Sequence, residues 1–278
     1  MAEVLSANGW LSGIGRYTLM ILTSFGRFWL FAAQTFTRTP TALIHKRDLR
    51  RLLPQCFVVG AESVPVILVT GSFVGMVLAI QAVEQFKAAG LVNRMGVIVS
   101  MSVVRELGPV LAGVMLAGRV GGALAAELGT MNVTEQLDAL RSMGSDPIRV
   151  LVVPRFLACV LLTPILTLYC DLMGVLGGWL ISVPVFDVSN WDYWTYTENA
   201  LETWDLGSGL IKSVFFGATI GLLACYKGFH CRQGAEGVGR ACTEAFVTGF
   251  VAILILDFFC GLALKGLYEA IWGFKMVF

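Results

Sequence analysis

Five long apolar stretches dominate this sequence, and their length is what most limits the folds open to it. A helix needs roughly 20 mainly apolar residues to cross the hydrocarbon core of a bilayer. The stretches lie at about 58–82, 97–128, 156–183, 210–226 and 246–267. Charged residues make up only 14% of the chain, whereas soluble domains carry about 25%. The sequence therefore predicts an all-α polytopic membrane protein with five transmembrane helices.

The first 53 residues are amphipathic and precede the transmembrane domain expected at 54–278. Aromatic and aliphatic residues are interleaved there with Arg16, Arg27 and Arg38, a pattern typical of a helix lying in the headgroup region. A first spanning helix at about 17–36 is the alternative. That helix would place Arg27 at the membrane centre at a cost of about 2.5–3.5 kcal/mol, so we expect an interfacial amphipathic helix.

Charge is distributed unevenly between the connecting segments. The segment at about 187–207 is rich in Trp and holds five acidic residues but no Lys or Arg. Basic residues gather instead in the N-terminal segment and in two connections, which carry Arg141, Arg149 and Arg155, and Lys227, Arg232 and Arg240. Because Lys and Arg favour cytoplasmic loops, we expect a cytoplasmic N-terminus. With five spans, the acidic segment and the C-terminus then lie on the outer side.

A short cytoplasmic helix is predicted at about 132–144, between the second and third spans. Asn132 and Glu135 have the spacing of a capping box, which predicts the start of this helix. Gly144 and Pro147 predict its end. Its apolar stripe consists of Val133, Leu137, Leu140 and Met143, and its charged residues off the stripe are Glu135, Asp138 and Arg141. Such a helix suits a groove on a partner protein, and the alternative is an ordinary connecting helix.

Several charged residues lie inside the apolar stretches, where an unpaired charge is costly. Arg105 and Glu106 stand just before Pro109, which favours a kink or break in the second span. Charges beside a broken helix are typical of transporter binding sites, and a structural ion pair is the alternative. Lys212 opens the fourth span, where its side chain can also reach to the outer interface. For Asp257, in the fifth span, we expect an interhelical hydrogen bond.

The sequence carries no motif for catalysis. It has no GxxxxGK[ST] phosphate-binding loop, no HExxH and no GxSxG. The chain is therefore not expected to hydrolyse ATP itself or to act as an enzyme.

Several ordered motifs resemble those of the MlaE (YrbE-like) permease family. They are Arg105–Pro109, Ala117–Gly122, Glu127–Met131, Val133–Leu140 and Val153–Arg155. The similarity extends over nearly the whole chain. The resemblance implies the permease subunit of an ATP-driven ABC transporter that moves phospholipids or similar hydrophobic lipids at the bacterial inner membrane. It also implies a contribution to outer-membrane lipid asymmetry.

The resemblance further implies partners and cofactors. Two copies of the chain are expected to pair, each bound to a cytoplasmic ABC ATPase subunit that carries ATP and Mg²⁺. A periplasmic MCE-domain lipid-binding protein is expected on the outer side, and a STAS-domain protein is a further candidate partner. The chain itself is expected to hold phospholipid but no metal or other cofactor, and no nucleic acid is expected as a partner.

Two sets of functional residues follow from the resemblance. The lipid-cavity set is Leu78, Arg105, Glu106, Leu107, Lys212 and Arg240. The ATPase-coupling set is Val133, Glu135, Leu137, Asp138, Leu140, Arg141 and Met143. Two functions of other classes stay open alongside a permease subunit. One is a self-sufficient secondary transporter or channel, and the other is a membrane scaffold without a transport role.

Overall fold

The computed structural model describes residues 2–44, 46–89 and 94–272, and these residues form helices and short connections without a strand. Five of the helical stretches are long and apolar enough to cross a membrane. They are Arg50–Lys87, Met95–Val133, Ile148–Phe186, Thr203–Phe229 and Ala235–Ile271. The prediction of an all-α polytopic membrane protein is confirmed.

Two of the five stretches are single α-helices, and a third is a single α-helix after an initial π-helical turn. These helices are α10 (Thr203–Phe229), α11 (Ala235–Trp272) and α8 (Val153–Phe186), which follows the π-helical turn η5 (Ile148–Val152). The first stretch joins α2 (Lys46–Cys56), the π-helical turn η1 (Phe57–Ala61) and α3 (Val64–Ala89). The second joins α4 (Met95–Ser102), η3 (Val103–Leu107), α5 (Gly108–Leu116), η4 (Ala117–Gly121) and α6 (Gly122–Val133). A π-helical turn holds one extra residue per turn and often occurs at a functional site.

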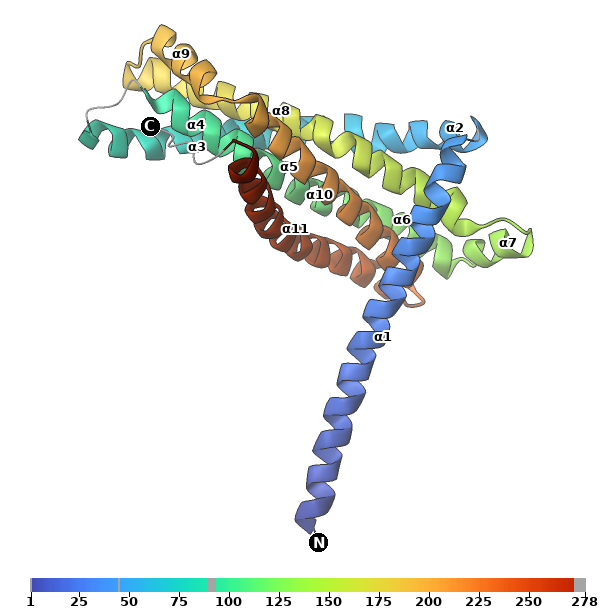
Figure 1. Ribbon diagram of the computed structural model, residues 1–278. Coiled ribbons are helices and arrows are strands. Elements are labelled where there is room, and N and C mark those ends of the chain that lie inside the picture. The colour runs from blue at the N-terminus through green and yellow to red at the C-terminus, as the bar shows by residue number, and fades with distance from the viewer. Residues whose placement is uncertain (1, 45, 90–93, 273–278) are drawn as a thin grey trace.

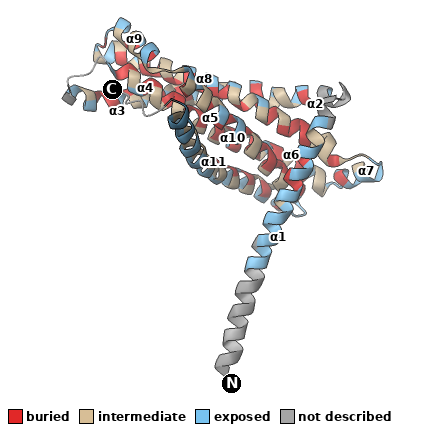
Figure 2. Ribbon diagram, in the orientation of Figure 1, coloured by how far each residue is buried: buried red, intermediate tan, exposed pale blue. Residues whose placement is uncertain are grey.

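Helix α8 packs most extensively against α3 and α10, and glycines make the close approach possible. A Cβ atom at Gly75 of α3 would collide with the carbonyl oxygen of Gly174 in α8. A Cβ atom at Gly217 of α10 would meet the carbonyl oxygen of Cys159 at 2.5 Å. Such small-residue contacts are common between membrane helices. Figure 2 shows buried residues concentrated where α5, α6 and α10 pass one another, whereas α11 is largely exposed.

The N-terminal helix α1 (Ala2–Ile44) is continuous through Pro40. It leaves the bundle near α7 (Gln136–Ser142) and runs across the direction of the long helices (Figure 1). Phe31, Ala32 and Thr35 attach it to the bundle, where they are buried. Within the described residues α1 is not among the helices apolar enough to span a membrane. The position of α1 in the headgroup region stays a prediction.

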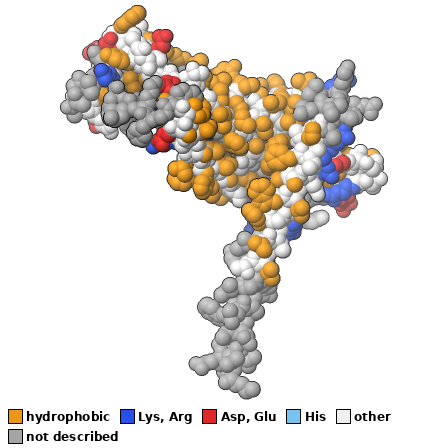
Figure 3. Space-filling model, in the orientation of Figure 1, with side chains coloured by type: hydrophobic (Ala, Val, Ile, Leu, Met, Phe, Trp, Pro, Cys, Tyr) orange, Lys and Arg blue, Asp and Glu red, His pale blue; other side chains and the backbone are white. Residues whose placement is uncertain are grey.

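The acidic segment forms a helix of its own, α9 (Asn190–Ala200), at the opposite end of the bundle from α7 (Figure 1). Tyr193 is fully buried, and its hydroxyl donates a hydrogen bond of 2.9 Å to the carbonyl oxygen of Val175 in α8. Trp191 is exposed. In Figure 3 hydrophobic side chains cover the middle of the bundle, and most charged side chains lie towards its two ends, as expected for a protein that crosses a bilayer.

Candidate functional site

A cluster of charged side chains joins η3 to α10 and α11 inside the bundle. The Nζ atom of Lys212 lies 2.7 Å from Oε2 of Glu106 and 3.1 Å from Oδ1 of Asp257. The Lys212 side chain is only 3% exposed, so its charge is balanced by these carboxylates rather than by water. We expected an interhelical hydrogen bond at Asp257, but the structure gives an interhelical ion pair, because Oδ1 of Asp257 lies near Nζ without a hydrogen bond to it. The alternative in which Lys212 reaches to the outer interface is wrong, because the side chain turns inward to its partners.

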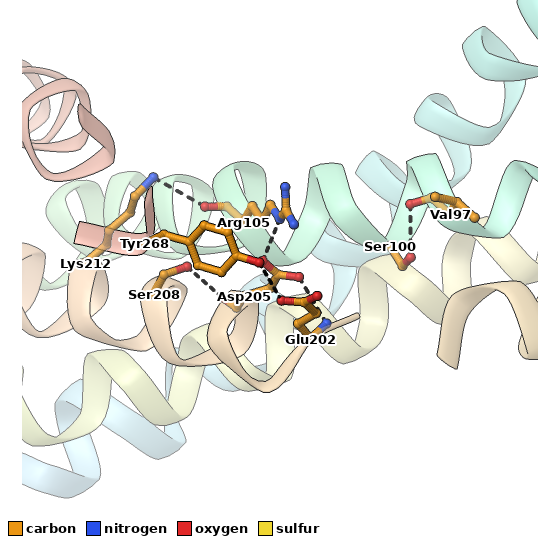
Figure 4. Close-up of polar contacts among 8 residues, drawn as sticks. All are labelled: Val97, Ser100, Arg105, Glu202, Asp205, Ser208, Lys212 and Tyr268. Carbon is orange, nitrogen blue, oxygen red and sulfur yellow. Dashed lines mark hydrogen bonds and ion pairs between the residues drawn. The ribbon is translucent and has the colours of Figure 1, made fainter. Parts of the chain in front are cut away.

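The second pair in the cluster fixes the start of α10. Nε of Arg105 donates a hydrogen bond of 2.7 Å to Oδ1 of Asp205, whose side chain is buried. The other carboxylate oxygen of Asp205 accepts from the backbone N–H of Glu202, which completes a capping box at the helix start. Tyr268 of α11 donates its hydroxyl hydrogen to Glu202 at 3.0 Å. Figure 4 shows these side chains converging from three segments.

Pro109 explains a third contact of Lys212. In an α-helix the N–H of residue 109 would bond to the carbonyl oxygen of Arg105, but proline has no N–H to donate. That carbonyl oxygen accepts a hydrogen bond from Lys212 Nζ at 3.3 Å instead (Figure 4). We expected Pro109 to kink or break the span. The structure places the π-helical turn η3 before it, and helix α5 continues from Gly108.

Arg105 and Glu106 therefore do not pair with each other, although they are neighbours in sequence. Each is paired with a residue of α10, and each keeps part of its side chain accessible: 38% for Arg105 and 56% for Glu106. The cluster holds two basic and three acidic side chains, because Asp205 and Asp257 join Glu106. An arrangement with accessible groups of both signs can contact the two charges of a zwitterionic headgroup.

The remaining residues of the predicted cavity lie apart from one another. Leu107 adjoins the cluster and is half-buried. Leu78 packs in a different apolar group, with Ala79 and Met95. Arg240 pairs with Glu244 near the start of α11, about 25 Å from Asp257 at a rise of 1.5 Å per residue. The structure thus brings Arg105, Glu106 and Lys212 together and separates Arg240 from them.

Sequence reasoning missed two members of this site. In the sequence Asp205 is one of the five charges of the acidic segment, and its spacing of three residues from Glu202 is that of a capping box, which indicates the helix start. Tyr268 had no such signal, because its contact with Glu202 spans 66 residues.

The predicted coupling helix begins later than expected. Helix α6 continues to Val133, and α7 starts only after Glu135, which adopts a left-handed conformation with φ of 60°. The predicted cap at Asn132 is wrong: its side-chain amide donates to the carbonyl oxygen of Cys231 at 3.3 Å. The predicted end at Gly144 is confirmed, since Gly144 has φ of 71° and its N–H bonds to the carbonyl oxygen of Arg141.

The stripe of α7 is divided between the bundle and the surface. Leu137 is 1% exposed and packs with Phe31, Leu128 and Phe229, so it anchors the helix. Leu140 and Val133 are half-buried. Of the other predicted coupling residues, Glu135, Asp138, Arg141 and Met143 are exposed. The surface that this segment leaves exposed is therefore its charged side and Met143 rather than the whole stripe.

Two ion pairs hold this end of the molecule together. Arg155 of α8 is buried and lies 2.7 Å from Glu127 of α6. Arg38 of α1 lies 2.7 Å from Asp146, between α7 and η5. They link both ends of the α7 connection to neighbouring helices. Among the residues that the structure describes, no group of His, Cys, Asp and Glu could hold a metal ion.

Comparisons with known proteins agree with this architecture. The family model described as Permease MlaE matches residues 52–263. A probable ABC transporter permease protein of Rickettsia prowazekii is 40% identical over 245 residues, which are 88% of this chain and 93% of that protein. The intermembrane phospholipid transport system permease protein MlaE of Haemophilus influenzae is 34% identical over 255 residues, covering 89% of this chain and 94% of the relative.

A relative also exists outside bacteria. The chloroplastic protein TRIGALACTOSYLDIACYLGLYCEROL 1 of Arabidopsis thaliana is 40% identical over 229 residues, which are 82% of this chain and 65% of that protein. The family match and these permease relatives identify a transport subunit rather than an enzyme. The chain belongs to the MlaE permease family.

Proposed function

We propose that this chain is the membrane-spanning subunit of an ATP-driven transporter that moves phospholipids at the bacterial inner membrane. The observation that carries the proposal is the cluster of Arg105, Glu106 and Lys212 within the spanning helices. Charges at this depth are costly and are typical of substrate pathways. Arg105 and Glu106 remain partly accessible, so a headgroup can reach them. A relative of this chain is named as a permease of an intermembrane phospholipid transport system.

The connection between α7 and the cluster supports an ATP-driven mechanism. Helices α4, α5 and α6 with their π-helical turns form one helical stretch from Met95 to Val133. Arg105 and Glu106 lie in this stretch, and α7 follows its end after two residues. A push on α7 by a closing ATPase would therefore be transmitted along a helix to the charged cluster. The π-helical turns are the places where such a helix can change its register.

The assembly that we propose contains two copies of the chain, with the lipid cavity between them. Helix α11 leaves most of its apolar residues exposed, and Phe258, Phe259 and Leu262 can contact a second copy or lipid tails. A cytoplasmic ABC ATPase would bind α7, and a periplasmic MCE-domain protein would receive the lipid near α9. This arrangement places the N-terminus in the cytoplasm and the C-terminus in the periplasm, with ATP and Mg²⁺ on the ATPase.

The coupling part of the proposal is tested by reversing charge on α7. The double variant Glu135→Lys and Asp138→Lys changes two exposed side chains and should abolish co-purification of the ATPase. The matched control is Asp192→Lys with Glu198→Lys, which makes the same charge change on α9 at the opposite end. ATPase retained by the α7 variant, or lost equally by the control, would contradict this role of α7.

Lipid exchange from proteoliposomes to an acceptor tests the transport part. Transport should require ATP and the ATPase, and Arg105→Ala should lower the phospholipid that co-purifies with the chain. A secondary transporter would move lipid without the ATPase, and a scaffold would move none under either condition. Unchanged lipid occupancy in Arg105→Ala would remove this residue from the lipid site.

A further inference from the structure

A second site lies at the end of the bundle near α7, away from the charged cluster. An open pocket of about 240 Å³ lies between α1, α7, η5 and the end of α10. Its lining residues are Arg27, Leu30, Phe31, Gln34, Arg141, Ile148, Phe229 and His230. No acidic residue is among them. We propose that this pocket binds the phosphate group of an anionic molecule at the membrane surface.

The basic side chains of the pocket come from different segments. Arg27 belongs to α1, Arg141 to α7, and His230 follows α10. Among the residues that the structure describes, Arg27 makes no ion pair, although it is exposed and faces this cavity. Arg141 gives one N–H to Asp138 at 2.7 Å, which leaves other donors of its guanidinium for a ligand. Guanidinium groups bind phosphate with two parallel hydrogen bonds, so two arginines suit this ligand.

His230 adds a further polar group. Its Nδ1 lies 3.0 Å from the carbonyl oxygen of Tyr226, and because a carbonyl can only accept, Nδ1 carries the proton of this hydrogen bond. Nε2 of this tautomer is a hydrogen-bond acceptor, so it can accept from a headgroup hydroxyl, while the phosphate oxygens take their hydrogen bonds from the arginines. The imidazole ring lies on Tyr226 and beside Phe31, with ring centroids 4.5 and 6.2 Å away, so the ring is held in place by packing.

The pocket lies at the level where the apolar part of the bundle ends. Phe229 is the last residue of one candidate span, and Ile148 is the first residue of another. Together with Leu30 and Phe31 they make up the apolar part of the lining, in addition to its basic groups. A lipid with an anionic headgroup matches this combination, because its phosphate meets the arginines while its glycerol and acyl carbons meet the apolar part. A soluble phosphate would use only the basic groups.

A phosphate in the pocket would connect α1 to the segment of α7 and Asp146. These two segments otherwise meet mainly through apolar packing and the Arg38–Asp146 ion pair. A phosphate shared by Arg27 and Arg141 would tie the N-terminal helix to α7. This inference concerns residues outside the charged cluster, so it does not depend on lipid transport.

Photocrosslinking of the full-length chain tests the proposal. The photoreactive residue p-benzoylphenylalanine replaces Gln34, which lines the pocket. In the control it replaces the neighbouring residue Ala33, which is exposed but does not line the pocket. The protein is placed in nanodiscs of phosphatidylcholine and phosphatidylglycerol at about four to one, a mixture that carries anionic headgroups. Crosslinked phosphatidylglycerol is measured by mass spectrometry. The probe at Gln34 should capture phosphatidylglycerol preferentially over phosphatidylcholine, and the probe at Ala33 should not.

The double variant Arg27→Gln and Arg141→Gln should lower this capture about tenfold, the loss expected from one charge-assisted hydrogen bond. The matched control Arg50→Gln with Lys265→Gln removes two exposed positive charges outside the pocket lining and should leave capture within about twofold, as for screened surface charges. Unchanged thermal unfolding in both variants confirms that they fold. Equal capture by the two variants would overturn the proposal.

A competition arm separates the two sources of phosphate. Capture that resists excess inorganic phosphate assigns the pocket to a lipid headgroup. Capture that inorganic phosphate abolishes, in protein that keeps both arginines, assigns it to a soluble phosphate-bearing anion. Because the measurement needs neither ATP nor the ATPase, its result is independent of the transport assay.

Discussion

Replacing Lys212 by methionine should destabilise the bundle chiefly by leaving Asp257 without a cation. Lys212 is buried, and Asp257 is 22% exposed at 3.1 Å from it. The attraction of two unit charges at this distance is about 5 kcal/mol at an effective dielectric constant of about 20. Desolvation of both groups offsets part of it, and removal of one partner of a buried pair typically costs about 3–5 kcal/mol. Glu106 adds little to the loss, because its side chain is mostly exposed and can be hydrated.

We therefore expect Lys212→Met to lower the free energy of unfolding by about 3 kcal/mol. The double variant Lys212→Met and Asp257→Asn removes both charges and should recover about 2 kcal/mol, since no buried charge is left unpaired. This coupling would exceed the average of about 0.6 kcal/mol for interhelical hydrogen bonds in membrane proteins. A coupling energy of about 2 kcal/mol is therefore expected from a buried ion pair but not from an ordinary interhelical hydrogen bond.

The measurement is a double-mutant cycle in which equilibrium unfolding in mixed micelles is monitored by circular dichroism. A cycle on Arg141 and Asp138, whose 2.7 Å ion pair is exposed on α7, serves as the control and should give at most about 0.5 kcal/mol. A coupling between Lys212 and Asp257 no larger than in this control would refute the reasoning.

Two further outcomes follow from the packing of the bundle. Gly75→Ala should cost about 2 kcal/mol or more of unfolding free energy, because its Cβ atom would collide with the backbone of Gly174. Gly122→Ala should be neutral or stabilising, because a Cβ atom at Gly122 meets open space. Unfolding of both variants in detergent checks this difference. Arg155→Met should cost about 2 kcal/mol, because it removes the charge-assisted hydrogen bond to Glu127 and the hydrogen bond to the carbonyl oxygen of Leu151. Addition of Glu127→Gln should change stability little further, since half-exposed Glu127 can be hydrated, and a large additional loss in the same assay would contradict this.

The features that depend on a single helix could be predicted from the sequence. The five spans follow from apolar length alone, because a segment with so few charges has no favourable place except a bilayer. The end of α7 at Gly144 is equally local, since a left-handed residue there is easiest for glycine.

The features that depend on two helices could not be predicted. Asn132 has the local pattern of a helix cap, but its amide is taken by a carbonyl 99 residues away, and α6 then has no reason to stop there. Lys212 has the position of an interfacial lysine, but it is buried against Glu106, which is 106 residues earlier in the sequence. The contact between the two charges offsets the cost of burying Lys212. In both cases a tertiary partner outweighs the local preference.

Pro109 connects the local structure of one helix to a contact between two helices. A proline inside a membrane helix leaves the carbonyl oxygen four residues earlier without its backbone donor, and lipid offers no water to replace it. A donor from another helix must therefore approach Arg105, and Lys212 is that donor. The ammonium group then requires carboxylates, which Glu106 and Asp257 supply. The missing N–H and the buried charge compensate each other, so the polar cluster forms where the backbone hydrogen bonding of the second span is interrupted.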